Sequence, residues 1–400
     1  MATQVQAEFP ARMRQLRLAR GWSFDDLVGE IGGAVTKAAL AKYESGQMRP
    51  STRVLNLLSS AFGVKTAHLL RPPGCEVKFV AYRKGAALTK MNQAQIEALV
   101  AQSLEQRVWL QATVHDPAAH PLRVAYLPVE DVPAAEKAAA TIRKDWKLGL
   151  DPIANLVDTL ENQHVHVVEI DAPPKFDGIS AYATQGHAVC AAAVASRIGV
   201  CGERQRFSLA HELGHLVMDV GADIDEEKAA HRFAAAFLAP AETIVKEVGG
   251  RRTRVSIDEL MLWKQRFGIS MQALIYRLKD LGIITESYCQ TLFKVFSANG
   301  WRRKEPGEFP AEKPNWLRKT IIRAAAEGLV SREQAETILG AELPCDTQPA
   351  PMRRRQFMKL PIEKRREILQ QQAERMASHY ESTGELEGIG GGDFIDDGSQ

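Results

Sequence analysis

The sequence predicts a multidomain, mainly α-helical protein: an all-α N-terminal domain, an α+β middle with a small sheet, and a helical C-terminal region. Its 400 residues suffice for two or three domains. Segments with helix start and stop signals follow one another from residue 8 to residue 70. Strand-like alternation is concentrated between residues 164 and 195, and helical periodicity resumes after it.

The bulk composition is that of a soluble globular protein, with 45% hydrophobic and 25% charged residues. A formal net charge of +2 provides no global field for nucleic acid, so any DNA site must come from local basic residues. The five cysteines are widely spaced without a CxxC pair, which suits reduced thiols. No signal peptide is apparent, and no stretch approaches the ~20 apolar residues of a membrane span. We therefore expect a cytoplasmic protein with no membrane partner.

The N-terminal segment, residues 8–70, contains the signals of five short helices. Ser23, Thr36 and Ser51 each precede a helical segment and can cap it. A "RPPG" break follows directly at 71–74. We predict an all-α domain over residues 1–72.

The next segment, residues 73–130, is predicted as a connector. It holds the strand candidate "VKFVAY" and the long amphipathic helix "NQAQIEALVAQSLEQRVWLQATV". Residues 131–300 are predicted as one α+β domain. The predicted helices "AAEKAAATIRKDWKL" and "PIANLVDTLENQ" come first, the strands "HVHVVEID", "ISAYAT" and "HAVCAAAV" follow, and further helices complete it. Residues 301–400 are predicted as a helical region with a flexible end rich in Gly and Asp.

The segment "AHELGH" suggests a metal site. His211 and His215 are four residues apart and project from the same helix face, while Glu212 lies about 100° around the helix. Two imidazoles can hold zinc, which lowers the pKa of a bound water from ~15.7 to about 7, and a carboxylate can take the proton. A catalytic zinc needs a third protein ligand, and spacing alone leaves Glu226 and Glu227 open. The alternative is an amphipathic helix with two surface histidines that bind nothing.

"RQRFSLAHELGHLVMD" followed by "EKAAHRFAAAFLAP" resembles the ImmA/IrrE family of bacterial zinc metallopeptidases, over roughly residues 130–285. The resemblance implies a zincin-like α+β fold and a gluzincin-like zinc metalloendopeptidase. It assigns His211, His215 and Glu227 as Zn²⁺ ligands and Glu212 as general base. The family usually has Asn or Asp where this chain has His231, which puts resting activity in doubt. His231 is a candidate outer-shell partner or extra ligand, or else a surface histidine.

Further candidates surround the metal segment. Cys190 or Cys201 is a candidate to cap the zinc, the alternative being a buried structural thiol. No oxyanion-stabilising donor is evident from spacing; Tyr276 and Arg277 are candidates, the alternatives being a core tyrosine and a surface arginine. An extended substrate is expected to pair with the sheet edge near "ISAYAT".

"TKAALAKYESGQMRPSTRVLNLLSSAFGV" resembles the recognition half of Xre/Cro-type helix-turn-helix domains. The resemblance places the helix that begins near Thr36 in the major groove of DNA. Thr36, Lys37 and Lys42 then face base edges, while Arg49 and Arg53 hold phosphates. The turn "EIGGAVTK" carries two extra residues, which puts the docking angle in doubt. The alternative is a helical bundle used for protein contact or dimerisation.

Together these features predict a DNA-binding transcriptional regulator with zinc-dependent endopeptidase activity. In the ImmA/IrrE family, members typically cleave an Xre-type repressor. We expect this chain to bind a double-stranded operator and to cleave a repressor, a partner protein or itself in response to stress or a ligand. The alternative is a non-proteolytic transcription factor or antitoxin whose peptidase-like domain senses metal, a ligand or a partner.

The expected partners also include a toxin and a second copy of the chain. The charged C-terminal helix resembles, more weakly, the tails of antitoxin-like proteins encoded beside toxins. Such a tail could fold on a partner, and a solvated helix is the alternative. Dimers are common for this DNA-binding class, and we expect a homodimer.

Overall fold

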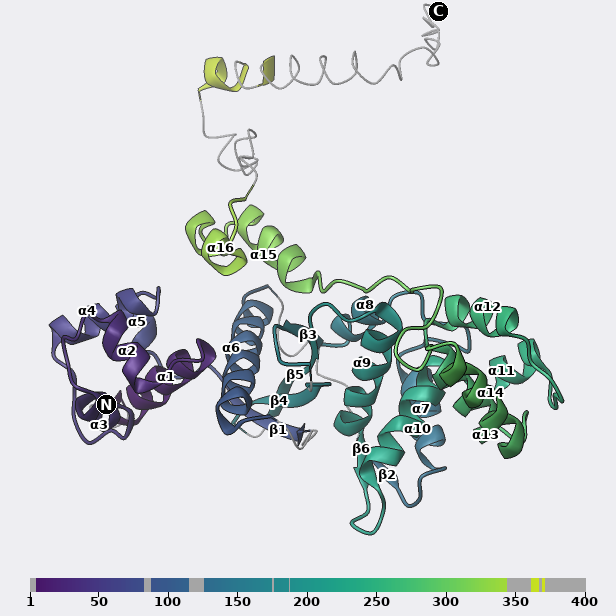
Figure 1. Cartoon of the computed structure of the whole chain (residues 1–400). Helices are drawn as coiled ribbons and strands as arrows, with labels where there is room; N and C mark the ends of the chain where they lie inside the picture. The colour runs from purple at the N-terminus through teal and green to yellow at the C-terminus, as the bar shows by residue number, and fades with distance from the viewer. Residues whose placement is uncertain are drawn as a thin grey trace, which may run out of the picture. The chain divides into compact units, whose positions relative to one another are not determined.

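A computed structural model gives the fold of the chain (Figure 1). The chain forms two compact units, residues 1–331 and the part from residue 332 onward. Most of the predicted C-terminal tail lies outside the described residues. Among the described residues, no helix combines the length and the apolar composition needed to cross a membrane. The structure describes residues 5–82, 88–114, 126–174, 176–186, 188–343, 361–366 and 369–370.

The N-terminal residues form the predicted all-α domain. The side chains of Ser23, Thr36 and Ser51 each accept a hydrogen bond from the backbone N–H three residues on, as the capping signals predict. A buried apolar cluster that includes Met13 and Leu58 holds the helices together. The helices are α1 (Val5–Ala19), α2 (Phe24–Glu30), α3 (Lys37–Glu44), α4 (Thr52–Ala61) and α5 (Thr66–Leu69).

The middle of the chain contains the expected small sheet. Its strand order is β1-β4-β5-β3; β4 is antiparallel to both of its neighbours, and β3 is parallel to β5. A second, two-stranded parallel sheet joins β2 to β6, which the sequence analysis missed. The strands are β1 (Glu76–Tyr82), β2 (Leu127–Val129), β3 (Val165–Ile170), β4 (Ile179–Gln185), β5 (Ala188–Arg197) and β6 (Met218–Val220).

The four-stranded sheet lies between two helices, α6 (Lys90–Val114) and α9 (Gly202–Val217), one on each face (Figure 1). Alternate residues of a strand point to opposite faces. On β4, Tyr182 belongs to the apolar cluster on the α9 side, and Ala181 belongs to the cluster on the α6 side. The segment predicted as a connector, 73–130, thus supplies both β1 and α6 to this layered core. The predicted domain boundaries at 72, 130 and 300 stay predictions.

Further helices surround α9, and α10 packs against both α9 and α7. Helices α11 and α14 were not predicted from the sequence, and the helix predicted over "PIANLVDTLENQ" begins only at Leu156. The helices are α7 (Ala135–Asp145), α8 (Leu156–Glu161), α10 (Glu226–Leu238), α11 (Ala241–Val248), α12 (Ile257–Phe267), α13 (Met271–Asp280), α14 (Glu286–Ala298) and α15 (Trp316–Ala326); α16 (Arg332–Leu339) lies in the second unit.

The N-terminus of α9 is fixed by a segment without helix or strand, residues 305–315. The Gly202 N–H donates to the Phe309 carbonyl at 2.9 Å. A side chain at Gly202 would overlap the Pro310 carbonyl, so only glycine allows this approach. Arg206 of α9, itself buried, pairs with Glu312 in the same segment. The orientation of α9 therefore depends on residues that come after the α+β core in the sequence.

One buried cation joins three parts of the chain. The Lys264 ammonium of α12 is fully buried and lies 2.7 Å from Glu203 on α9 and 3.2 Å from Glu305. Glu305 also accepts the N–H groups of Met271 and Gln272 at the start of α13. Buried charges of this kind are tolerated only when they are paired.

Replacing Lys264 with methionine should therefore destabilise the protein. The change leaves two nearly buried carboxylates facing each other without a cation, at a cost of about 3–5 kcal/mol. Chemical denaturation should report a free energy of unfolding lower by that amount. Lys246→Met on α11, an exposed lysine, is the control and should change stability by less than about 0.5 kcal/mol. Equal stability of the two variants would contradict a structural role for this ion cluster.

Candidate metal centre and DNA-binding face

Two histidines of α9 lie in the interior with their ring nitrogens together. His211 and His215 are only 2% and 3% exposed. Because they are four residues apart on one helix, they share a face. Their Nε2 atoms are 3.1 Å apart.

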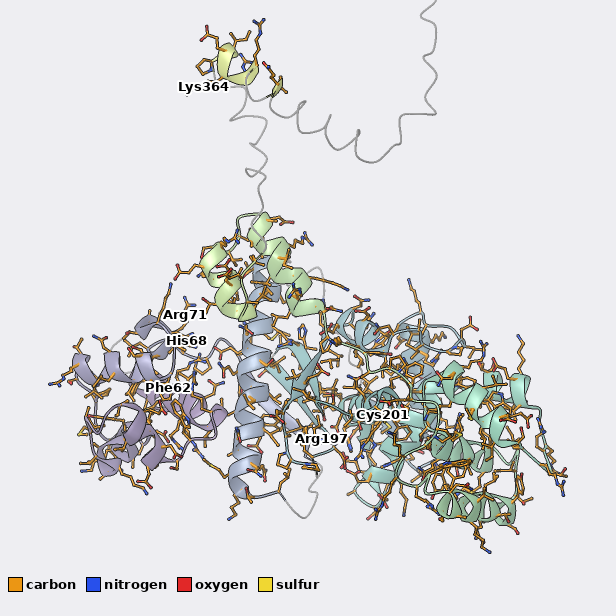
Figure 2. All side chains as sticks on the ribbon, turned by 45° about the horizontal axis from the view of Figure 1, so that its top comes forward. Phe62, His68, Arg71, Arg197, Cys201 and Lys364 are labelled. Atoms are coloured by element: carbon orange, nitrogen blue, oxygen red, sulfur yellow. The ribbon has the colours of Figure 1, made fainter. Side chains whose placement is uncertain are left out.

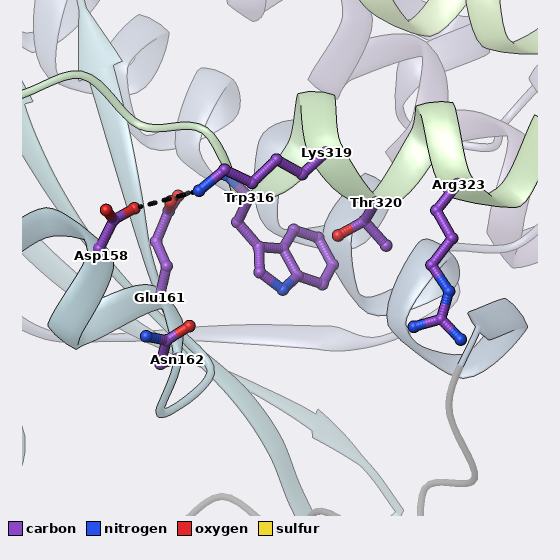
Figure 3. Close-up of a pocket in the computed structure, with 7 residues that line it drawn as sticks. All are labelled: Asp158, Glu161, Asn162, Trp316, Lys319, Thr320 and Arg323. Carbon is purple, nitrogen blue, oxygen red and sulfur yellow. Dashed lines mark hydrogen bonds and ion pairs between the residues drawn. The ribbon is translucent and has the colours of Figure 1, made fainter. Parts of the chain in front are cut away.

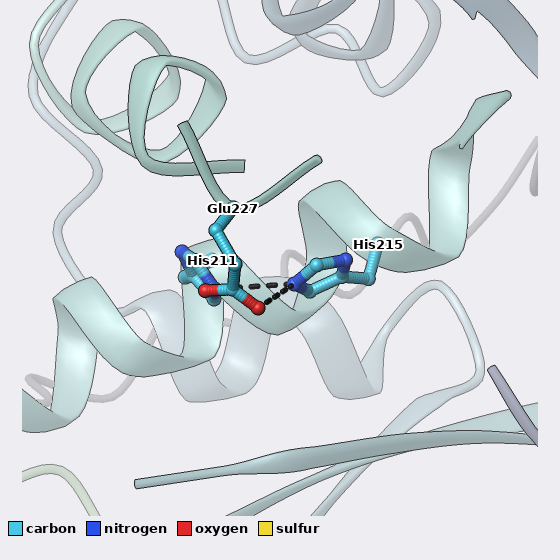
Figure 4. A group of neighbouring side chains, drawn as sticks. All are labelled: His211, His215 and Glu227. Atoms are coloured by element: carbon cyan, nitrogen blue, oxygen red, sulfur yellow. Dashed lines mark hydrogen bonds and ion pairs between the residues drawn. The ribbon is translucent and has the colours of Figure 1, made fainter. Parts of the chain in front are cut away.

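A carboxylate from α10 meets these two nitrogens (Figure 4). The Glu227 Oε2 lies 3.4 Å from Nε2 of His211, and its Oε1 lies 3.7 Å from Nε2 of His215. Asp225 caps α10 by accepting the Lys228 N–H, which places Glu227 in the first helical turn. One ligand atom from each of the three residues lies within 4.8 Å of the others.

This donor set fits zinc. Zinc–nitrogen and zinc–oxygen bonds of about 2.0–2.1 Å at tetrahedral angles hold neighbouring donors about 3.3–3.4 Å apart. The measured separations of 3.1, 3.4 and 3.7 Å lie around that value. Two imidazoles and one carboxylate also match the ligands of catalytic zinc sites, which leave a fourth position for water or substrate.

The neighbouring glutamate makes a different contact. Glu226 Oε1 lies 2.9 Å from Nδ1 of His215. A carboxylate at Nδ1 favours the tautomer whose Nε2 is available to a metal, and it holds the ring in place. Spacing left Glu226 and Glu227 as equal candidates for the third ligand; the structure places Glu227 at the Nε2 atoms and Glu226 behind His215.

Glu212 points toward the start of β4. It is 2% exposed, and a Cβ built on Gly178 would lie 2.5 Å from its Oε1 atom. Gly178 therefore lets the backbone before β4 approach the carboxylate more closely than any other residue would. The sequence analysis did not single out Gly178, because one glycine before a strand is too common a signal.

His231 lies beside the cluster. Its Nδ1 is 2.7 Å from the Glu227 carbonyl, one turn back on α10. Its exposed ring meets the His211 ring edge-to-face, with centroids 4.5 Å apart. Its predicted role as outer-shell partner or extra ligand stays a prediction.

The two cysteines are not at the metal cluster. Cys201, labelled in Figure 2, directly precedes the first residue of α9. It comes ten residues before His211, which corresponds to about 15 Å along the helix. Cys190 packs against the apolar cluster on the α6 side of the sheet, opposite α9. Burial raises the pKa of both thiols, which keeps them protonated. The candidate role of either thiol as a zinc cap is wrong.

The contacts of the two candidate oxyanion donors lie elsewhere. Arg277 is buried and donates to the Ala239 carbonyl at 3.0 Å and to Glu136 at 2.5 Å. Tyr276 is 49% exposed, and its ring packs on Phe293. The alternatives considered from the sequence were a core tyrosine and a surface arginine. The structure shows a buried arginine and an exposed tyrosine, because α13 packs its arginine face inward.

A separate pocket of about 220 Å³ lies between α8 and α15 (Figure 3). Trp316 and Arg323 of α15 form one wall. Glu161 of α8 lies at its base and accepts the backbone N–H groups of Asn315 and Trp316, while burial raises the pKa of its carboxyl. Both bonds go to Oε2 and fix the start of α15, whereas Oε1 of Glu161 is buried without a hydrogen-bond partner among the described residues.

The candidate DNA contacts lie on the outer side of the N-terminal domain. Helix α3 buries Leu40 and Tyr43 against the domain core. The predicted contact residues are all exposed, and Thr36 also caps α3. The Lys37 ammonium lies 2.6 Å from the exposed carboxylate of Asp25. The exposed set consists of Thr36, Lys37, Lys42, Arg49 and Arg53.

Two glycines shape the turn before α3, where two extra residues are expected from the family resemblance. Gly32 and Gly33 both have positive φ, +64° and +70°, between the end of α2 and Thr36. Left-handed backbone of this kind favours glycine, so the turn lengthens without strain.

Comparisons with known proteins match two separate parts of the chain, one in the N-terminal helical domain and one around the metal cluster. A family model described as a helix-turn-helix matches residues 13–69, and one described as an IrrE N-terminal-like domain matches residues 202–279. Searches among curated proteins and among solved structures return no match. The second match contains α9 and α10, and hence every residue of the metal cluster. The chain is therefore a fusion of an Xre-like helix-turn-helix domain with an ImmA/IrrE-like peptidase domain.

Proposed function

We propose that this DNA-binding regulator is also an active zinc-dependent endopeptidase. The observation that carries the proposal is the convergence of His211, His215 and Glu227 on one point, with Glu212 on the same helix. Three ligands with one open position are typical of catalytic zinc, whereas structural sites are closed by four.

His211, His215 and Glu227 would hold the ion. When bound, zinc polarises the scissile carbonyl and lowers the pKa of water. Glu212 takes the proton as the water oxygen adds to the carbonyl carbon, and returns it to the amine nitrogen when the C–N bond breaks. Glu226 keeps the His215 ring in the required tautomer.

For DNA binding, we propose that α3 enters the major groove. Thr36, Lys37 and Lys42 would face base edges, and Arg49 and Arg53 would contact phosphates. The Lys37–Asp25 pair does not oppose this, because an exposed ion pair is worth little and is easily exchanged.

As substrates we propose an Xre-type repressor, a partner protein such as a toxin, or the chain itself, cleaved in response to stress or a ligand. A homodimer on a double-stranded operator is the expected DNA-bound form. The second candidate is a regulator that binds metal without cleaving protein. It is favoured by His231, which replaces the usual short side chain beside His211.

Glu212→Gln should keep the metal and lose hydrolysis. The amide cannot accept the proton from water, so cleavage should fall about 10²–10⁴-fold. Intact-protein mass spectrometry would follow fragments of the chain, and of proteins encoded beside it, after incubation with zinc. Glu242→Gln, at an exposed site on α11, is the matched control. Metal-loaded wild-type protein that never produces a fragment would favour the non-proteolytic regulator.

Zinc should stabilise the folded chain through His215. An ion that binds only the native state at 100 times its Kd adds about 2.7 kcal/mol to the free energy of unfolding. Differential scanning fluorimetry should therefore show a higher Tm with zinc for the wild type and for His68→Ala, an exposed histidine on α5. His215→Ala should lose most of this shift. An unchanged shift in that variant would place the ion elsewhere.

Lys42→Ala and Arg53→Ala should each weaken binding to duplex DNA. Removing one phosphate contact lowers the slope of log affinity against log salt by about 1, whereas a base contact changes sequence preference. Fluorescence anisotropy across a salt series would separate the two effects. Lys246→Ala on α11 is the control. Unaltered affinity in both variants would favour a protein-binding role for this helical domain.

A further inference from the structure

The outer edge of β4 is already paired with a strand of the same chain. Strand β1 runs antiparallel to β4, from Glu76 opposite Thr184 to Tyr82 opposite Ile179. The sequence analysis expected this edge to receive an extended substrate. In the described structure β1 covers this edge, which could not be predicted because local periodicity does not reveal which strands pair.

This edge borders the candidate metal centre. Gly178, which touches the Glu212 side chain, directly precedes Ile179. The end of β1 at Tyr82 therefore lies beside the part of β4 that approaches the general base. Helix α9, which carries both histidines, packs against β4 and also against β1.

Among the described residues, β1 is the most exposed strand of this sheet. Its inward side chains, Val77 and Phe79, are only half-buried, whereas Ala181 and Ala183 of β4 are fully buried. The pairing is interrupted between Phe79 and Ala81, where the exposed Val80 forms an irregularity. An edge strand with a bulge contributes fewer hydrogen bonds and less buried apolar area than its neighbours.

We propose that the edge of β4 binds an extended segment of a protein substrate, and that β1 occupies this binding position in the described structure. Strand β1 must therefore detach from β4 before a substrate segment can bind. The inference rests on the proposed peptidase function only in calling the segment a substrate. Antiparallel strand addition uses main-chain hydrogen bonds, so it accepts many sequences. The preferred segment carries apolar side chains at alternate positions, as Val77 and Phe79 do in β1.

The start of β1 is tied to the DNA-binding domain. The Gly74 N–H donates to Glu105 on α6 at 2.9 Å, and the Gly74 carbonyl accepts from Gln185 at the end of β4. The same Glu105 carboxylate binds Arg12 of α1 at 2.5 and 2.6 Å. Burial opposes ionisation of Glu105, but the bonds from Arg12 and Gly74 outweigh it and lower the pKa of the carboxyl. One residue thus anchors both α1 and the approach to β1.

The first test is binding of a labelled peptide with the sequence of residues 76–82 to the full chain. The tethered β1 has an effective concentration of the order of mM, so wild-type protein should bind the free peptide poorly. Phe79→Asp places a charge against the apolar cluster and should raise affinity about tenfold or more by anisotropy. Val80→Asp, on the same strand but exposed, is the matched control and should bind like wild type. Equal affinities for the three proteins would overturn the proposal.

A second test fixes β1 onto β4 with a disulfide, so that the edge should no longer bind the peptide. This test can be interpreted even if a variant that weakens β1 fails to fold. Glu76→Cys and Thr184→Cys place two thiols at directly opposed positions of the antiparallel pair, where Cβ atoms usually lie about 4.5–5.5 Å apart, close to the range of a disulfide. In the Phe79→Asp background, oxidation should abolish peptide binding and reduction should restore it. If Phe79→Asp unfolds, the cross-link is tested in the wild-type background at high peptide concentration. Binding that persists after oxidation would place the peptide elsewhere and overturn the proposal.

Glu212→Gln separates this inference from the proposed function. The peptide should bind Phe79→Asp equally well with or without this change. Peptide binding without any protein hydrolysis would reject the peptidase and keep the β4 docking edge. Hydrolysis at the same rate in wild type and Phe79→Asp would keep the peptidase and reject β1 as an occupant of its substrate position.

Discussion

The fold depends on the pairing of two charged groups, Glu203 and Arg206, that the first half of α9 brings into the interior. Burying an unpaired charge costs several kcal/mol, so each needs a partner. Lys264 supplies one for Glu203, and Glu312, 106 residues further along the chain, supplies one for Arg206. The same helix then presents His211 and His215 to Glu227. The metal-binding face is therefore positioned by contacts at the opposite end of α9.

The part of the site that could be predicted is the part fixed by helix geometry. His211 and His215 share a face because a turn has 3.6 residues. The caps at Ser23, Thr36 and Ser51 follow equally from local chemistry. The third ligand could not be predicted from helix geometry, because the choice between Glu226 and Glu227 depends on how α10 packs on α9. Spacing alone left Glu226 open, and only the family resemblance pointed to Glu227.

Contacts between segments distant in sequence were the ones that could not be predicted. The pairing of β1 with β4 joins residues about a hundred positions apart, and strand periodicity says nothing about partners. The close approach of Gly178 to Glu212 depends on the placement of a whole sheet against a helix. Cys201 was a plausible zinc ligand by proximity in sequence, but helix rise carries it to the far end of α9.

Strand β1 and the edge that it covers belong to one polypeptide. Opening of this edge is consequently a unimolecular step, and the equilibrium of that step does not depend on the concentration of the protein. A blocking segment supplied as a separate protein would dissociate on dilution, whereas this one keeps a stoichiometry of one at every level of expression. Because Glu105 binds both Arg12 of α1 and the Gly74 N–H, a change in the position of α1 would alter that balance.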